Sequence, residues 1–267
     1  MKHRLAILAA LVATALGAPA AAEEAPDRDA MMQWGLALAG NVESDHGLIR
    51  MRDALCLVVA AEDQALAAKV ARRVVDNAKD VGLPNRRGKC RPNAVIVLAE
   101  DAQTQLVELN EDRGRVYGSL YAARLDRILA NETDGFAFQV AELLPNGVPS
   151  AFRRVQASRI QPGGTDMIGS LVVIDKAAAE GLHPVQLADY ASLRLLAPTS
   201  DLHQLQDSSA ESPVSILTLF RDRDRAPAEM TRFDRAYLES LYRLPQGSFA
   251  RSIMARASKV ALADMQP

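Results

Sequence analysis

The feature that most constrains the fold is a β-α-β pattern near the start of the chain. An apolar run at 55–60 and a β-branched run at Ala94–Ala99 both have the length and composition of strands. Between them, at 63–81, apolar residues recur at helical spacing, with Leu66, Val70 and Val74 on one face and Arg73 among the polar residues on the others. Parallel strands need such a crossover. We therefore expect the two strands to lie side by side and parallel.

The rest of the chain adds further strands and then helices. Alternating hydrophobicity at 135–154 around a turn at 145–147 predicts a hairpin whose second strand spans 148–155, and another strand is expected at 169–174. Thr231 and Asp234 hold capping-box positions, and Phe249 and Ile253 are expected on one face of the last helix. The predicted helices are 183–197, 231–243 and 248–263, with a short apolar turn at 215–220. The expected fold class is α/β (α+β): a small mixed sheet with a β-α-β opening, a hairpin and a helical C-terminal third.

Residues 1–22 predict a secretory signal peptide. Lys2, His3 and Arg4 precede an apolar run of about 13 residues, and 20–22 form an A-x-A cleavage site. That run is too short to span a bilayer, and no later apolar stretch is long enough, so no transmembrane segment is expected in the mature chain. We expect an N-terminal approach segment at 23–45, with a loop and a short helix around 31–38, and a single globular domain at 46–267. The protein is predicted to be exported, to the periplasm or the extracellular space.

Composition and charge exclude several classes of function. Hydrophobic residues make up 49% and charged residues 24% of the chain, which is the balance of an ordinary globular protein. Removing Lys2 and Arg4 from the 31 Lys and Arg residues leaves 29 against 33 Asp and Glu, a net charge of −4 that disfavours nucleic acid as a partner. An exported chain also meets little ATP or NAD, so we predict no cofactor.

The two cysteines, Cys56 and Cys90, predict a disulfide. An even pair in an oxidising compartment is typical of a structural bond. On the chain-entropy estimate this bond would stabilise the fold by roughly 3–4 kcal/mol. A redox pair normally has CxxC spacing, and a zinc site would need two further ligands at a recognised spacing, so both alternatives are weaker.

Familiar catalytic motifs are incomplete in this sequence. Residues 82–89 resemble a phosphate-binding loop, but the spacing from Gly82 to Gly88 is one residue too long and Cys90 stands where Ser or Thr would hold Mg²⁺. No serine lies in a GxSxG context. The mature histidines show neither HExxH nor an i, i+4 pair, so we predict no metal site. They are His46, His183 and His203. The alternating Arg and Asp residues at 221–225 are interpreted as an exposed loop.

The predicted helix at 183–197 carries the one polar face that could bind a ligand. At 100° per residue, one half of the helix is apolar and faces the core. The other half holds Gln186, Asp189, Tyr190 and Arg194 beside Leu193. Gln186, Tyr190 and Arg194 stack at i, i+4 and i+8, which fits either a binding surface or a solvated face with internal pairing.

The order of several segments resembles a family of uncharacterised exported proteins from α-proteobacteria, over about residues 50–245. The segments that carry the resemblance are 52–56, 90–93, 172–175 before 186–190, 215–220 and 233–238. More remotely, the layout is similar to domains built on a zincin-protease framework. In a working zincin the helix after the edge strand carries HExxH, whereas this chain has His183, Gln186, Asp189 and Tyr190 in that segment. The resemblance therefore implies a zincin-like framework without metal ligands.

These observations give three hypotheses. The first is an exported binding or structural module of the cell envelope that has no catalysis of its own, with the 183–197 helix face as its surface for a protein, peptide or envelope component. The second is a peptidase-like or cell-wall hydrolase in which Asp189 or Asp234 is the general base and Tyr190 a proton donor. The third is an inhibitor or assembly factor whose N-terminal segment, from Glu23, docks on a partner.

Overall fold

We describe the chain from a computed structural model. The structure describes residues 27–40, 47–86, 88–108, 126, 129–130, 134–141, 166–199 and 214–263. The predicted signal peptide, His46 and His203 lie outside these residues. No helix in the described ranges is long and apolar enough to cross a bilayer.

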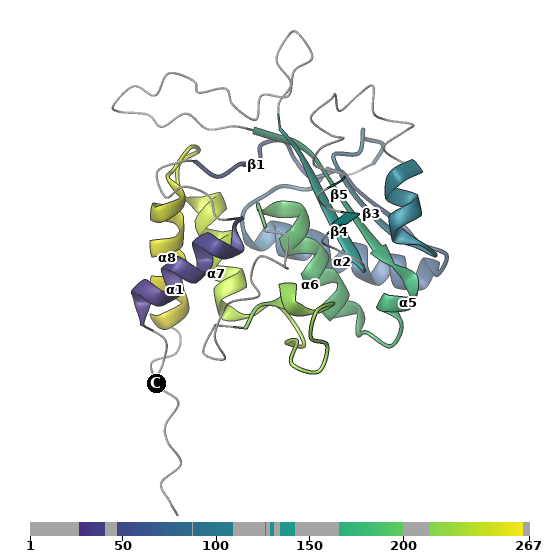
Figure 1. The fold of residues 1–267 in the computed structure, drawn as a ribbon. Helices are drawn as coiled ribbons and strands as arrows, with labels where there is room; N and C mark the ends of the chain where they lie inside the picture. The colour runs from purple at the N-terminus through teal and green to yellow at the C-terminus, as the bar shows by residue number, and fades with distance from the viewer. Residues whose placement is uncertain are drawn as a thin grey trace, which may run out of the picture.

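One mixed sheet forms the centre of the fold (Figure 1). Its strands are β1 (Arg50–Met51), β2 (Leu57–Ala60), β3 (Ala94–Ala99), β4 (Gly135–Ala141) and β5 (Asp166–Asp175). The neighbours β2, β3 and β5 are parallel, and β1 runs parallel to the start of β5. β4 lies antiparallel along the other side of β5. The predicted α/β class and parallel β-α-β opening are confirmed.

The predicted hairpin lies only partly within the described residues. β4 begins where the sequence predicts it, and it pairs antiparallel with β5 through a register that joins Phe136 to Val173 and Gln139 to Ser170. The predicted return strand at 148–155 lies outside the described residues. The period-2 pattern found both strands, but it carries no information about which strand pairs with which.

Each face of the sheet buries a different core. Along one face, Ile96 and Val172 pair across the strands and pack in the main core with α2 (Gln64–Asp80) and α6 (Pro184–Leu196). On the opposite face Val173 and Phe136 pack with Ala102 and Leu106 of the helical stretch 102–108. Helices therefore cover both faces of the central strands.

α2 forms because its sequence supplies both a cap and an apolar stripe. Asp63 accepts hydrogen bonds from the amides of Ala65 and Leu66, which satisfies donors of the first turn. Val70 and Val74 are fully buried. The short helix α5 (Lys176–Ala179) follows β5 and leads to α6.

The C-terminal helices pack with the N-terminal helix and extend the main core. These helices are α7 (Arg232–Arg243), α8 (Ala250–Ala263) and α1 (Arg28–Leu38), with the 3₁₀ turn η2 (Ile216–Thr218) between α6 and α7 in sequence. α1 lies against α8 (Figure 1). A Cβ at Gly35 would come within 2.7 Å of Phe233 Cζ and 2.8 Å of Met254 Sδ, so this contact needs a glycine. Phe249 precedes α8 and is 39% exposed, so it does not share the buried face of Ile253 as expected.

The Cys56–Cys90 disulfide is present and joins residues 34 apart in sequence. Cys56 directly precedes β2, and Cys90 lies shortly before β3. The bond therefore ties together the starts of two parallel strands, as the sequence predicts.

Candidate functional site

α6 carries the four side chains that the sequence nominates as a binding face, and the structure encloses most of that helix. His183 is the N-cap, and its Nδ1 accepts a hydrogen bond of 3.3 Å from the Val185 amide. The helix contacts α2, β4, β5, η2 and α7. Every residue from Leu187 to Leu196 is buried. The expectation of an exposed polar face is therefore wrong for Asp189, Tyr190 and Arg194.

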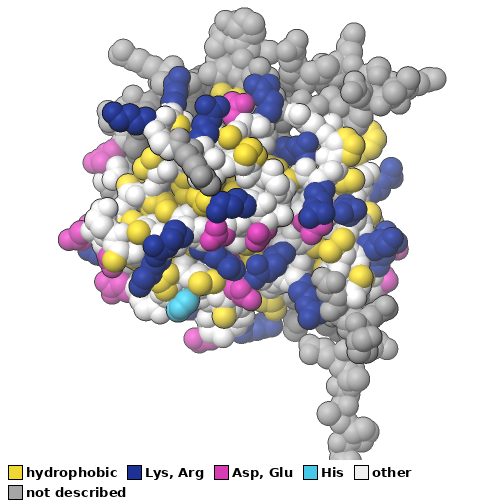
Figure 2. All heavy atoms as spheres, turned by 180° about the vertical axis from the view of Figure 1, so that it is seen from behind, with side chains coloured by type: hydrophobic (Ala, Val, Ile, Leu, Met, Phe, Trp, Pro, Cys, Tyr) yellow, Lys and Arg dark blue, Asp and Glu magenta, His cyan; other side chains and the backbone are white. Residues whose placement is uncertain are grey.

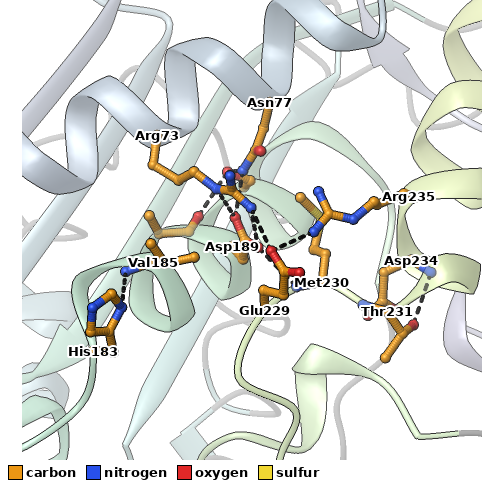
Figure 3. A network of polar contacts seen from close by, with 12 residues as sticks. Arg73, Asn77, His183, Val185, Asp189, Glu229, Met230, Thr231, Asp234 and Arg235 are labelled. Atoms are coloured by element: carbon orange, nitrogen blue, oxygen red, sulfur yellow. Dashed lines mark hydrogen bonds and ion pairs between the residues drawn. The ribbon is translucent and has the colours of Figure 1, made fainter.

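Asp189 is the centre of a buried network that joins α2, α6 and the segment before α7 (Figure 3). Its Oδ1 accepts from Arg73 Nε at 2.7 Å and from Asn77 Nδ2 at 2.8 Å. Its Oδ2 accepts from Arg73 Nη2 at 2.9 Å and from the Met230 amide at 2.8 Å. We call Arg73, Asn77, Asp189 and the Met230 amide the polar clamp.

The clamp sets the charge state of Asp189. Burial alone raises the pKa of this carboxyl group, but the hydrogen bonds from Arg73, Met230 and Asn77 outweigh burial and hold the pKa below its ordinary value. Asp189 is therefore an ionised group with a fixed cationic partner. A bidentate Arg–carboxylate contact is among the strongest polar contacts that proteins use.

Polar contacts continue outward from the clamp to the surface. Asn77 Nδ2 also donates to Ser192 Oγ at 2.9 Å. Arg73 Nη2 lies 3.2 Å from Glu229 Oε2, and the same oxygen forms an ion pair with Arg235 Nη2 at 2.7 Å (Figure 3). Arg73 is 28% exposed and Glu229 56% exposed, so the chain of contacts ends in solvent.

The other three nominated residues make structural contacts outside the polar clamp. Gln186 is half-buried and donates to the Pro227 carbonyl at 2.8 Å. The Tyr190 hydroxyl donates to the Gly135 carbonyl at 3.3 Å, and its ring meets Phe220 edge-on at 4.8 Å between centroids. Arg194 is 1% exposed, donates to Thr199 Oγ1 at 3.2 Å and lies 6.0 Å from the Tyr190 ring centroid. Arg194 and Tyr190 thus contact each other inside the fold, and they do not form an exposed surface with Gln186.

Side chains from β4 and α7 hold the C-terminal end of α6. Gln139 Nε2 donates to the carbonyls of Arg194 and Ala197, at 3.0 Å for Arg194. The Tyr242 hydroxyl donates to the Leu196 carbonyl at 2.9 Å. The last carbonyls of a helix have no partner within the helix, and these donors supply one.

Asp234, the other carboxylate considered as a general base, is fully buried and caps two elements. Its Oδ2 accepts from the amides of Thr231 and Ile216, both at 2.9 Å, and its Oδ1 accepts from Ser215 Oγ at 2.6 Å. The Thr231 hydroxyl accepts from the Asp234 amide, which completes the predicted capping box. Burial raises the pKa of Asp234, and these hydrogen bonds offset only part of that effect.

Sequence reasoning missed the two partners of Asp189 on α2. It assigned Arg73 to the solvent-facing side of that helix, whereas Arg73 and Asn77 lie one turn apart beside the Val70–Val74 stripe and face α6. One signal was available. Tyr190 and Leu193 fall within the supposedly polar half of α6, and a helix that is apolar on most sides is usually enclosed.

The comparisons with known proteins add no family to this description. Within the described ranges, no three His, Cys, Asp or Glu side chains gather in a way that could hold a metal ion. The chain matches no model of a protein family, no curated protein and no solved structure.

Proposed function

We propose that this chain is an exported binding or structural module of the cell envelope that has no catalysis of its own. The observation that carries the proposal is the environment of Asp189. This carboxylate is 0% exposed and accepts four hydrogen bonds from its own fold. A general base must reach the proton that it removes, and Asp189 has neither access to a substrate nor an oxygen left to accept that proton.

The other candidate groups support the same proposal. Asp234 is 0% exposed, and its carboxylate oxygens accept hydrogen bonds from Ser215, Ile216 and Thr231. The Tyr190 hydroxyl is already used as the donor of a hydrogen bond to the Gly135 carbonyl. A Cβ at position 135 would come within 2.7 Å of the Tyr190 oxygen, which indicates close packing rather than an opening at this point. These groups stabilise contacts between elements, as expected of a scaffold.

Two assays test the proposal on the full mature chain. The first measures release of products from a mixed peptide library and from purified peptidoglycan, and we expect none above buffer. The second measures sedimentation of the labelled protein with isolated cell envelopes, and we expect saturable retention. Product release by the wild type, or unsaturable or absent retention on the envelopes, would overturn the proposal.

The second candidate, a peptidase-like or cell-wall hydrolase on a zincin-like framework, has one observation in its favour. A strand, β5, precedes α6 with only the short helix α5 between them, as in the segment order of that resemblance, although β5 pairs on both sides and is not an edge strand. The same hydrolysis assay tests it, with Asp189→Asn and Asp234→Asn beside the wild type. This candidate requires turnover that one of these variants abolishes while its circular dichroism spectrum stays native.

A further inference from the structure

The loop between α2 and β3 is positively charged, and its backbone is held by hydrogen bonds and a disulfide. Between Asp80 and Glu100 the sequence holds Arg86, Arg87, Lys89 and Arg91 and no acidic residue. The structure describes residues 82–86 and 88–92 of this segment, which we call the cationic loop.

Several contacts fix the cationic loop against the chain that enters β2. The Leu55 amide donates to the Pro84 carbonyl at 2.7 Å, and the Arg86 amide donates to the Leu55 carbonyl at 2.8 Å. Further along the loop, the Cys56–Cys90 disulfide provides a second attachment to the chain that enters β2. Asn93 then accepts from the Cys56 amide at 2.7 Å through Oδ1. The backbone of the loop is thus held at both ends before any ligand binds, which lowers the entropy cost of binding.

The charged ends of the loop are exposed to solvent and, within the described part of the chain, free of acidic partners. Arg86, Lys89 and Arg91 are exposed, and among the described residues no carboxylate lies within ion-pair distance of them. Asp53, which lies just before the anchored Leu55, pairs with Arg52 at 3.9 Å. At the carboxyl ends of the strands, by contrast, Lys176 follows β5 and contacts both Glu62 and Glu100. Figure 2 shows the more usual pattern on the rear face, where acidic side chains lie among the basic ones.

We propose that the cationic loop is a docking surface for anionic phospholipid bilayers. In the described chain no hydrogen bond orients the three charged ends, so the loop offers a fixed backbone whose charges have no partner that sets their geometry. A single small anion needs donors in a set geometry, whereas lipid head groups move laterally and can meet charges in any arrangement. Val58, which lies two residues after Cys56 and is 41% exposed, adds apolar surface close to the anchor.

The test is sedimentation of the mature protein with vesicles of phosphatidylcholine and phosphatidylglycerol in equal parts, and with vesicles of phosphatidylcholine alone. We expect binding to the anionic vesicles that weakens as salt is added. Each Lys or Arg near such a surface contributes a factor of about five. The triple variant Arg86→Gln, Lys89→Gln, Arg91→Gln should therefore bind roughly 100-fold more weakly.

Two further variants make the result specific. The matched control, Lys69→Gln, Arg72→Gln, Lys259→Gln, removes the same charge from other exposed positions and should bind like the wild type. The double variant Arg86→Lys, Arg91→Lys should keep its binding, because attraction to an anionic bilayer depends on positive charge and does not need the bidentate hydrogen bonds of arginine.

Three outcomes of the vesicle assay would overturn the proposal. They are equal binding to both vesicle types, equal losses in the two triple variants, and loss of binding in the Lys variant, which would indicate a site for one defined anion. Preferential binding of dextran sulfate over the anionic vesicles would assign the loop to a soluble polyanion instead. This proposal deepens the proposed function, because a loop that binds bilayers would also retain the protein on cell envelopes. The triple variant Arg86→Gln, Lys89→Gln, Arg91→Gln in the envelope assay separates the two: undiminished retention would leave the proposed function standing while this proposal fails.

Discussion

Two buried aspartates show how the surroundings of a carboxylate decide its part in the fold. Asp189 and Asp234 are both 0% exposed and both lie on helices of the main core. Asp189 faces the guanidinium of Arg73, and its pKa lies below the ordinary value. Asp234 receives only neutral donors, from Ser215, Ile216 and Thr231, and its pKa lies above the ordinary value.

The difference teaches that hydrogen bonds alone do not replace a counter-ion in a buried site. Neutral donors partly compensate the loss of hydration, but a paired cation compensates more. Asp189 therefore joins α6 to α2 through its ion pair with Arg73, and to the segment before α7 through the Met230 amide. Asp234 instead organises the chain around it, since it caps α7 and also orders the start of η2. The predictions below test this contrast.

The largest effect is expected for Asp189→Ala. The substitution leaves Arg73, Asn77 and the Met230 amide without their acceptor, and breaking a buried pair from one side costs about 3–4 kcal/mol. Urea unfolding followed by circular dichroism measures this loss. Asp76→Ala on the exposed side of α2 is the control and should change little. A loss below about 1 kcal/mol for Asp189→Ala would contradict the assigned role.

Next in size is the difference between the two asparagine variants. Asp189→Asn places amide hydrogens against the Arg73 donors and removes the charge, so we expect it to lose about 3 kcal/mol. Asp234→Asn keeps an acceptor for neutral donors and removes a poorly compensated charge, so its loss should be about 1 kcal/mol. The same urea titrations measure both values. Equal losses would mean that Arg73 adds nothing beyond an ordinary hydrogen bond.

Much of the fold follows from local patterns, whereas the candidate site does not. The periodicity of α2, the β-branched run of β3 and the Thr231–Asp234 capping box all lie within one element, and the structure has each of them. The clamp joins residues that are far apart, because Arg73 lies 116 positions and Met230 41 positions from Asp189. A helical wheel of α6 shows which residues share a face. It does not show that α2 and the chain before α7 cover that face.

A smaller and more diagnostic effect is the pH dependence of stability. The lowered pKa of Asp189 means that its contribution is complete above the unfolded value of about 3.9 and is lost as the pH falls through the folded pKa. For Asp234 the raised pKa means that the folded state binds more protons, so its contribution decreases as the pH rises from about 3.9 through the folded pKa.

Unfolding free energies of the wild type and of both asparagine variants, measured from well below the unfolded aspartate pKa of about 3.9 up to neutral pH, test these signs. The advantage of the wild type over Asp189→Asn should shrink as the pH falls. Its advantage over Asp234→Asn should instead grow. Two differences with the same slope would show that the two carboxylates occupy equivalent environments, and the contrast would be lost.

The smallest effect is expected where the clamp meets solvent, for Arg235→Ala. Arg235 is 41% exposed and its partner Glu229 is 56% exposed, so water replaces this ion pair at a cost of no more than about 0.5 kcal/mol. Urea unfolding of Arg235→Ala alone, and of the double variant with Asp189→Ala, gives the coupling between the two sites. We expect the two losses to add. A coupling near 1 kcal/mol would mean that Glu229 transmits the Arg235 charge to Arg73, and the clamp would then extend from α2 to α7.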